Sequence, residues 1–313
     1  MAIDRRGASV LFDVREILAR KWSDFSCQPK LLEFHARGLQ RARERCPEMA
    51  VRRARGIEMA YDEAGSGVPV VLLHGFPFNR TMWRDQVAAL KDSHRVVAPD
   101  LRGHGETTVP TEPATMEEMA RDVAALLDEL QIGRPVLGGL SMGGYVALAF
   151  CRLFPRRVRA LVLADTRPQA DTEAAKLARE ETARRALAEG MTPICDAMLP
   201  KLLSHTTHMK HPEAVERVRE MILATKPEGA AAALRGMAAR RDQTGLLADI
   251  LQPTLVVVGG EDQITPPADS ELMRREIRGS RLEVIEGAGH VSNVERPAEF
   301  NAALTKFLRD LQP

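Results

Sequence analysis

The chain has 313 residues, and its 44 Lys and Arg residues nearly balance its 43 Asp and Glu residues, for a formal net charge of +1. This length accommodates one large α/β domain with an insertion, or two small domains. The balanced charge, without any stretch of dense basic residues interleaved with aromatics, excludes a typical nucleic-acid partner and favours a small neutral ligand.

Neither the apolar runs nor the cysteines indicate a membrane or metal protein. The longest apolar runs, such as residues 69–73 and 255–260, have the length of strands, whereas a membrane span needs about 20 apolar residues. The N-terminus lacks the apolar region and cleavage site of a secretory signal. The four cysteines lie far apart without a C-x-x-C pair. We therefore expect a soluble protein with no membrane span, no zinc site and a cytoplasmic location.

Residues 1–48 do not follow the pattern of the rest of the chain. Val10, Leu11, Val14, Ile17 and Leu18 recur at the spacing of a helix. We predict that this segment is a helical N-terminal extension, and the sequence leaves its role open.

From about Met49, short β-rich runs alternate with helical stretches. Strands are predicted at residues 51–55, 57–61, 68–73, 95–98, 135–140, 158–163, 254–258 and 281–285, with the first two forming an antiparallel start. Helices are predicted at residues 81–91, 115–130, 142–154, 267–277 and 297–311. This alternation predicts an α/β fold in which a mostly parallel eight-stranded sheet is covered by helices on both faces.

One connection is much longer than the others. About ninety residues separate the sixth strand from the seventh, where a crossover needs about a dozen. Residues 167–249 are rich in helix-forming residues, and four prolines divide them into several short helices: Pro193, Pro200, Pro212 and Pro227. We expect a helical cap inserted after the sixth strand, with residues 49–166 and 250–313 forming the core.

The sequence Gly139-Leu140-Ser141-Met142-Gly143 follows a predicted strand directly and precedes a predicted helix. This is the context of a G-x-S-x-G nucleophile elbow, in which the serine takes strained backbone angles and the flanking glycines leave room for the turn. Its position at a helix N-terminus favours developing negative charge. Ser141 is therefore the predicted nucleophile.

A serine hydroxyl needs a neighbouring base, usually a histidine oriented by a carboxylate, in the chain order serine, acid, histidine. Asp262 follows the seventh predicted strand and His290 follows the eighth, so both loops leave the same edge of the sheet. We predict Asp262 as the acid and His290 as the base. Asp165, at the end of the sixth strand, is the second candidate for the acid, and Glu261 adjoins Asp262.

The sequence His74-Gly75-Phe76-Pro77 ends the third predicted strand. A loop N–H at this place should complement the N–H of the residue after the nucleophile, so the backbone N–H groups of Phe76 and Met142 are the predicted oxyanion hole. His74 competes with His290 for the role of base. It precedes the nucleophile in the chain and sits beneath the loop, which favours a structural hydrogen bond instead.

The segment Asp100-Leu101-Arg102-Gly103-His104-Gly105 is similar to a phosphate-binding loop only superficially. Neither G-x-G-x-x-G nor G-x-x-x-x-G-K-[ST] occurs in the chain, so no nucleotide cofactor is expected. We expect Asp100 and Arg102 to brace this loop beside the oxyanion hole.

Five segments in this order, HGFP, DLRGHG, GLSMGG, GGEDQITPP and GAGHVSNVERP, resemble the oxyanion loop, fourth-strand loop, nucleophile elbow, acid loop and histidine loop of the α/β-hydrolase superfamily. GLSMGGYVALAF with LVLADTRPQADT is most similar to bacterial esterases and 3-oxoadipate enol-lactonase-like hydrolases. The resemblance implies hydrolysis of a small-molecule ester or lactone through an acyl-enzyme on Ser141, with no metal or organic cofactor. Residues 1–48 depart from it, since these relatives usually begin near the first strand.

Other activities on the same fold stay open at this point. Ser141 argues against family members that act on halides or epoxides, because those carry an aspartate nucleophile. C–C hydrolases of aromatic ring-cleavage products, cofactor-free perhydrolases and noncatalytic ligand-binding members remain as alternatives. The natural substrate and the oligomeric state cannot be read from the sequence.

Overall fold

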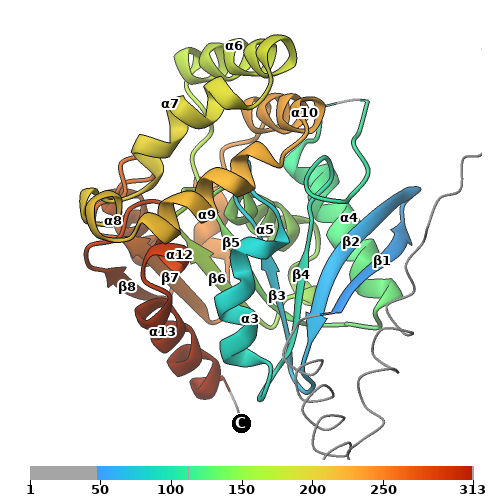
Figure 1. Cartoon of the computed structure of the whole chain (residues 1–313). Helices are drawn as coiled ribbons and strands as arrows, with labels where there is room; N and C mark the ends of the chain where they lie inside the picture. Colours follow the sequence, from blue (N-terminus) through green and yellow to red (C-terminus); the bar gives the residue numbers. More distant parts are fainter. Residues whose placement is uncertain (1–47, 112, 312–313) are drawn as a thin grey trace, which may run out of the picture. The chain divides into compact units, whose positions relative to one another are not determined.

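In a computed structural model, residues 48–111 and 113–311 are described, and their central feature is one eight-stranded sheet (Figure 1). Its strands are β1 (Glu48–Ala54), β2 (Ile57–Ala64), β3 (Pro69–Leu73), β4 (Arg95–Pro99), β5 (Val136–Leu140), β6 (Ala160–Ala164), β7 (Thr254–Gly259) and β8 (Arg281–Ile285). The predicted extension at residues 1–48 lies outside the described residues, except for Glu48, and stays a prediction.

The strand order is β1-β2-β4-β3-β5-β6-β7-β8. β2 runs antiparallel to β1 and to β4, and all other neighbours are parallel. The predicted mostly parallel sheet with an antiparallel start is therefore confirmed. β5, β6 and β7 are buried along their whole length, as expected for parallel strands with helices on both faces.

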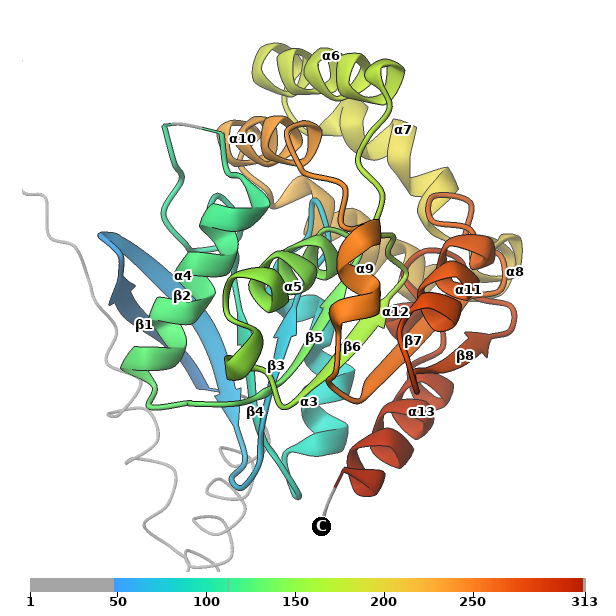
Figure 2. The same ribbon diagram turned by 180° about the vertical axis from the view of Figure 1, so that it is seen from behind.

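Helices cover both faces of the sheet. α3 (Arg84–Leu90) and α13 (Pro297–Asp310) lie on the face turned to the viewer in Figure 1. α4 (Met116–Glu129), α5 (Met142–Leu153) and α11 (Pro267–Glu276) lie on the opposite face (Figure 2). α4 begins with a side-chain cap, because Thr115 accepts a hydrogen bond from the N–H of Glu118. None of the helices in these described residues is long and apolar enough to cross a membrane.

The prediction of a single helix at residues 81–91 was wrong. The chain forms a 3₁₀ helix there, η1 (Arg80–Trp83), followed by α3. Asn79 caps η1 through the N–H of Thr81, and Asp100 accepts the N–H of Arg80 at 2.7 Å. These contacts fix the first turn to the neighbouring loop. Two further short elements escaped the sequence analysis, η2 (Pro155–Arg157) and α12 (Ser292–Glu295), whereas η3 (Thr244–Asp249) lies in the segment predicted as several short helices.

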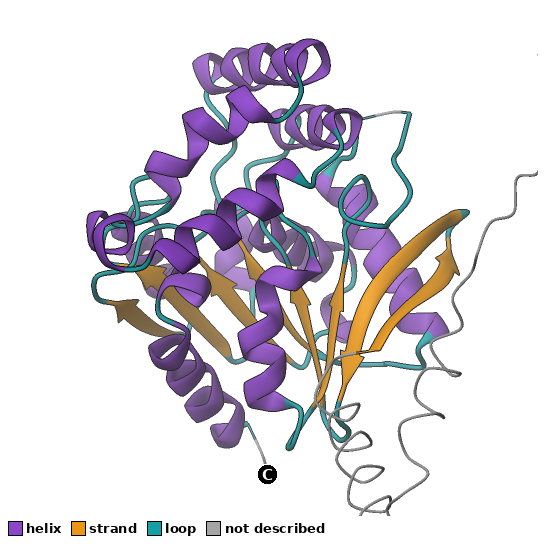
Figure 3. Ribbon diagram, viewed as in Figure 1, coloured by secondary structure: helices purple, strands orange, loops and turns teal. Residues whose placement is uncertain are grey.

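Five helices lie between β6 and β7 and stand above the sheet (Figure 3): α6 (Glu173–Glu189), α7 (Thr192–Leu202), α8 (His205–Lys210), α9 (Pro212–Leu223) and α10 (Pro227–Ala238). We call residues 167–249 the helical insertion. Pro193, Pro212 and Pro227 lie in the first turn of a helix, where a missing N–H is harmless. Pro200 was expected to separate helices, but it lies inside α7, two residues before the end of that helix.

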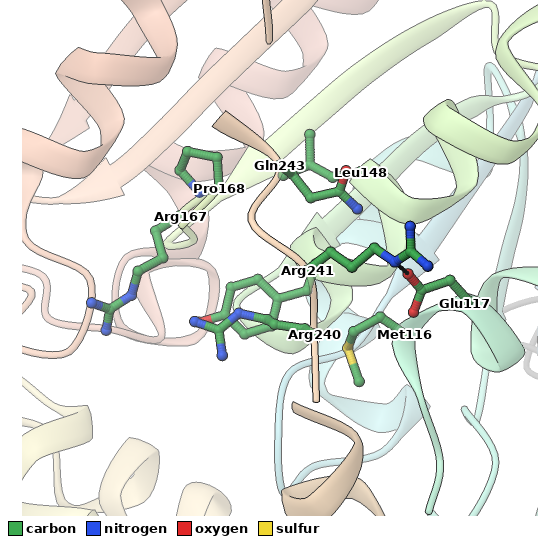
Figure 4. Close-up of a pocket in the computed structure, with 9 residues that line it drawn as sticks. Met116, Glu117, Leu148, Arg167, Pro168, Arg240, Arg241 and Gln243 are labelled. Carbon is green, nitrogen blue, oxygen red and sulfur yellow. Dashed lines mark ion pairs between the residues drawn. The ribbon is translucent and has the colours of Figure 1, made fainter. Parts of the chain in front are cut away.

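Arg240 joins the two ends of the helical insertion. Its buried guanidinium lies 2.7 Å from Asp171, 4.3 Å from the ring centroid of Tyr145 in α5, and donates to the carbonyl of Gln169. Figure 4 shows this region, where Arg240, Arg241 and Gln243 are among the residues that line a small cavity. The cavity there has a volume of about 10 Å³, enough for roughly one water molecule. It is too small to hold a substrate.

Candidate active site

Ser141 stands in a strained turn between β5 and α5. Its backbone angles are φ 53° and ψ −113°, a region that residues with a side chain rarely adopt. The turn is tight, because a Cβ atom at Gly139 would lie 2.1 Å from the carbonyl oxygen of Gly143. A Cβ atom at Gly143 would lie 2.2 Å from the carbonyl oxygen of Leu73. The two flanking glycines are therefore required by the close approach of the backbone.

The structure brings the three residues predicted as a catalytic triad into one chain of hydrogen bonds. Nε2 of His290 lies 2.8 Å from Oγ of Ser141, and Nδ1 of His290 lies 2.8 Å from Oδ2 of Asp262. The exposed fraction is 8% for Ser141, 2% for His290 and 4% for Asp262. In neutral His290 this arrangement places the proton on Nδ1 and leaves Nε2 free to accept the serine proton.

Asp262 is held by the loop that follows it. Oδ1 accepts the N–H groups of Ile264 and Thr265, and Oδ2 accepts the hydroxyl of Thr265 at 2.7 Å. Burial by itself would raise the pKa of Asp262, but His290 and the hydrogen bonds from Thr265 outweigh it and lower the pKa below its usual value. The carboxylate thus stays ionised at neutral pH. Sequence reasoning missed Thr265, and the available signal was Asp262 itself, because an aspartate in a turn often accepts the N–H two residues on.

The two alternative acids have other surroundings. Asp165 is completely buried, accepts the N–H of Gly259 at 2.8 Å, and lies 2.5 Å from the hydroxyl of Ser292. Burial, and next the negative charge of Asp262, raise the pKa of Asp165 well above its usual value. Glu261 is exposed. Of the three carboxylates, Asp262 is the one hydrogen-bonded to His290.

The two residues predicted for the oxyanion hole lie on neighbouring strands. Phe76 lies in the loop after β3, and Met142 is the first residue of α5 after β5. β3 and β5 are paired in parallel, with Leu73 opposite Gly139, so both loops leave the same edge of the sheet. The Phe76 loop contacts the helical insertion, because the hydroxyl of Thr225 donates to the carbonyl of Pro77 at 2.5 Å.

His74, the competing base, is occupied by the backbone. Its Nε2 accepts the N–H of Leu101 at 2.9 Å, so Nδ1 carries the proton and donates to the carbonyl of Gly75. Burial lowers the pKa of His74 to about 4. The neighbouring ring of His104, 5.0 Å away between centroids, is also buried, and its pKa is lowered to about 3. Both imidazoles are therefore neutral, and their rings pack beneath the Phe76 loop.

The loop after β4 is braced by ion pairs. Asp100 pairs with Arg80 and accepts the N–H of Glu106 at 3.0 Å. Arg102 makes two short hydrogen bonds to Asp122 of α4. The pair formed by Asp100 secures the start of η1, next to the Phe76 loop, whereas the pair formed by Arg102 secures the loop to α4.

In the part of the chain that is described, no group of three or more potential metal ligands comes together.

A cavity of about 220 Å³ opens between the helical insertion and the acid loop. Arg185, Met198 and Lys201 line it on the side of α6 and α7, and Ile264 lines it on the other side. The N–H of Ile264 donates to Asp262, so this cavity comes close to the acid side of the candidate site.

Comparisons with known proteins agree with this architecture. A family model described as the alpha/beta hydrolase fold matches residues 68–297. The chain is 33% identical over 231 residues, or 74% of its length, to 3-oxoadipate enol-lactonase 2 from Acinetobacter baylyi, of which it covers 85%. A thermophilic esterase from Thermogutta terrifontis, solved with malate bound, is 45% identical, with a TM-score of 0.83 over 85% of this chain and 100% of that one. An enol-lactonase from Burkholderia xenovorans LB400 is 30% identical, with a TM-score of 0.78 over 83% of this chain and 100% of that one.

Proposed function

The chain belongs to the α/β-hydrolase family and is an esterase or lactonase of that family, and we propose that it works through an acyl-enzyme formed on Ser141. The proposal rests on one observation above all. Ser141, His290 and Asp262 are linked by two hydrogen bonds of 2.8 Å each, in the order that a serine nucleophile requires. The proposed substrate is a small-molecule carboxylic ester or lactone.

In the first step, Nε2 of His290 takes the hydroxyl proton while Oγ of Ser141 attacks the carbonyl carbon. The carbonyl oxygen becomes an oxyanion, which the N–H groups of Phe76 and Met142 stabilise by hydrogen bonds. Collapse of this intermediate breaks the bond to the alcohol oxygen, which receives the proton from His290. In a lactone, the alcohol stays attached to the acyl group.

In the second step, His290 takes a proton from water, and the resulting hydroxide equivalent attacks the acyl carbon. The carboxylic acid leaves as Ser141 regains its proton from His290. Throughout, Asp262 accepts the N–H of Nδ1 and stabilises the imidazolium that forms. The lowered pKa of Asp262 supports this role, because only the ionised carboxylate carries the required charge.

The names of the relatives favour ester and lactone hydrolysis over C–C hydrolysis or peracid formation. The residues proposed for the site come from this chain alone, and no cofactor enters either step. The cytoplasmic location expected from the sequence remains a prediction.

The test is a panel of p-nitrophenyl esters of graded chain length together with small lactones, followed with wild type and Ser141→Ala. We expect a burst of p-nitrophenol equal to the enzyme concentration, and a loss of kcat on the order of 10⁶-fold in Ser141→Ala. A fluorophosphonate probe should label Ser141 in native but not in heat-denatured protein. Absence of labelling in folded protein would favour a noncatalytic binding member, and turnover without a burst would argue against accumulation of an acyl-enzyme.

A further inference from the structure

Glu295, at the end of the short helix α12, is a buried carboxylate outside the proposed triad. Its exposed fraction is 4%. Oε1 accepts the N–H of Gly289 at 2.7 Å, and Oε2 accepts the N–H of Ser204 at 2.8 Å. Gly289 directly precedes His290, whereas Ser204 belongs to the turn between α7 and α8. One side chain therefore joins the histidine loop to the helical insertion.

Three further contacts connect the same two segments. The N–H of His290 donates to the carbonyl of Leu202 at 2.9 Å, and the hydroxyl of Ser204 donates to the carbonyl of Gly287 at 2.9 Å. The backbones also approach closely, because a Cβ atom at Gly289 would lie 2.8 Å from the nitrogen of Ser204. The turn at residues 202–204 and the loop at residues 287–290 thus form one hydrogen-bonded unit.

Burying a carboxylate is unfavourable unless hydrogen bonds replace the lost water. Here the two replacement donors are the backbone N–H groups of Gly289 and Ser204, which lie 85 residues apart in the chain. Both oxygens of Glu295 must therefore sit where these two N–H groups point. The side chain can satisfy both donors only when the histidine loop and the α7–α8 turn keep their relative position.

We propose that Glu295 is a positioning residue that holds His290 in reach of Ser141 by fixing the histidine loop to the α7–α8 turn. The helical insertion then takes part in the reaction by holding the base in place. The inference rests on the proposed roles of Ser141 and His290. A displacement of about 1 Å between reacting groups can lower the rate about a hundredfold, so loss of this contact should lower kcat.

The most selective test uses Ser204, because its hydroxyl can be removed alone or together with its N–H. Ser204 has φ −63° and ψ 156°, which proline adopts without strain. Ser204→Ala removes the hydroxyl and keeps the N–H, whereas Ser204→Pro removes both. We expect kcat of Ser204→Pro to be about tenfold to a hundredfold below that of Ser204→Ala, with KM within about threefold, because the proline ring removes the N–H bonded to Glu295 and its Cδ atom displaces the carboxylate from that position.

Glu295 itself is tested by Glu295→Gln, which keeps the volume but has only one oxygen acceptor for two N–H donors. We expect kcat to fall about a hundredfold. Fluorophosphonate labelling of Ser141 should slow in parallel.

Asn293→Ala is the matched control. Asn293 is buried in the same helix, and its side chain donates to the carbonyl of Met82 and to the side chain of Gln86. It should lower the melting temperature about as much as Glu295→Gln while kcat stays within about threefold. Equal kcat in Ser204→Pro and Ser204→Ala, or an equal loss in Asn293→Ala and Glu295→Gln, would overturn the inference. Full activity of Ser141→Ala would instead overturn the proposed function.

Discussion

Nδ1 of His290 lies 2.8 Å from Oδ2 of Asp262, and both side chains are almost completely buried. An imidazole in this position depends on the carboxylate for its tautomer and for stabilisation of its charged form. The relationship distinguishes Asp262 from the other two carboxylates near the site, and it can be tested directly.

Asp262→Asn should lower kcat on the order of 10⁴-fold, because the amide keeps the shape but lacks the charge and can favour the wrong tautomer. Asp165→Asn should stay within about tenfold of wild type, since Asp165 bonds to Gly259 and Ser292 rather than to His290, and its surroundings raise its pKa and so disfavour the charge that an amide lacks. Glu261→Gln should change kcat least of the three substitutions, because the Glu261 side chain is exposed. Steady-state kinetics on an activated ester check this order, and a crippled Asp165→Asn beside an active Asp262→Asn would reassign the acid.

The buried histidines predict loss of stability in acid. The pKa values of His74 and His104 are lowered to about 4 and about 3, so folding favours their neutral forms. Their contribution is complete above the unfolded value near 6.5 and is lost as pH falls from there through the folded values, at up to about 1.4 kcal/mol per pH unit for each group. Asp165, with a raised pKa, acts in the opposite direction.

Urea unfolding between pH 7.5 and 4.5 separates these contributions. His104→Gln should reduce the decrease in unfolding free energy over this range, because one titrating group is gone. His211→Gln is the control, since that side chain is 41% exposed. If His104→Gln and His211→Gln lose stability with the same pH dependence as wild type, the buried imidazole is not the cause.

Arg240→Met should lower the free energy of unfolding by about 2 kcal/mol, because it removes the ion pair with Asp171 and the contact with the Tyr145 ring. Arg179 still pairs with Asp171, which limits the loss. The matched control is Arg241→Met, next in the chain, with a side chain 74% exposed and a distant partner in Glu117. In guanidinium unfolding, the control should lower the free energy of unfolding by less than about 0.5 kcal/mol. Equal losses would assign no special role to Arg240.

Removal of residues 1–46 should leave kcat/KM on an activated ester within about tenfold of wild type, or about 1.4 kcal/mol. The reason is that the proposed site residues lie between Phe76 and His290. The cut is placed before Glu48 because β1 begins there, earlier than the sequence predicted. A loss as large as that of Ser141→Ala would mean that the extension completes the active site.

The sequence by itself predicted the sheet, its eight strands and the three residues that the structure links by hydrogen bonds. These features depend on local signals: apolar runs of strand length, glycines on both sides of Ser141, and polar residues directly after strands. In a parallel sheet the carboxyl ends of strands meet at one edge, so positions far apart in the chain could be placed together. Asp262 was predicted as the acid with Asp165 as the second candidate, because both follow a strand at that edge, and the hydrogen bond from His290 to Asp262 is seen only in the structure.

Only the tertiary structure decided how the helical insertion meets this edge. Glu295 lies in the segment that resembles the histidine loop, but its contacts gave no signal in the sequence, since its two partners are the backbone N–H groups of Gly289 and Ser204, which any residue except proline could supply. The continuation of α7 through Pro200 likewise depends on the packing of the insertion. Local propensity and periodicity describe single elements, whereas these contacts depend on the relative position of two elements, which long-range packing determines.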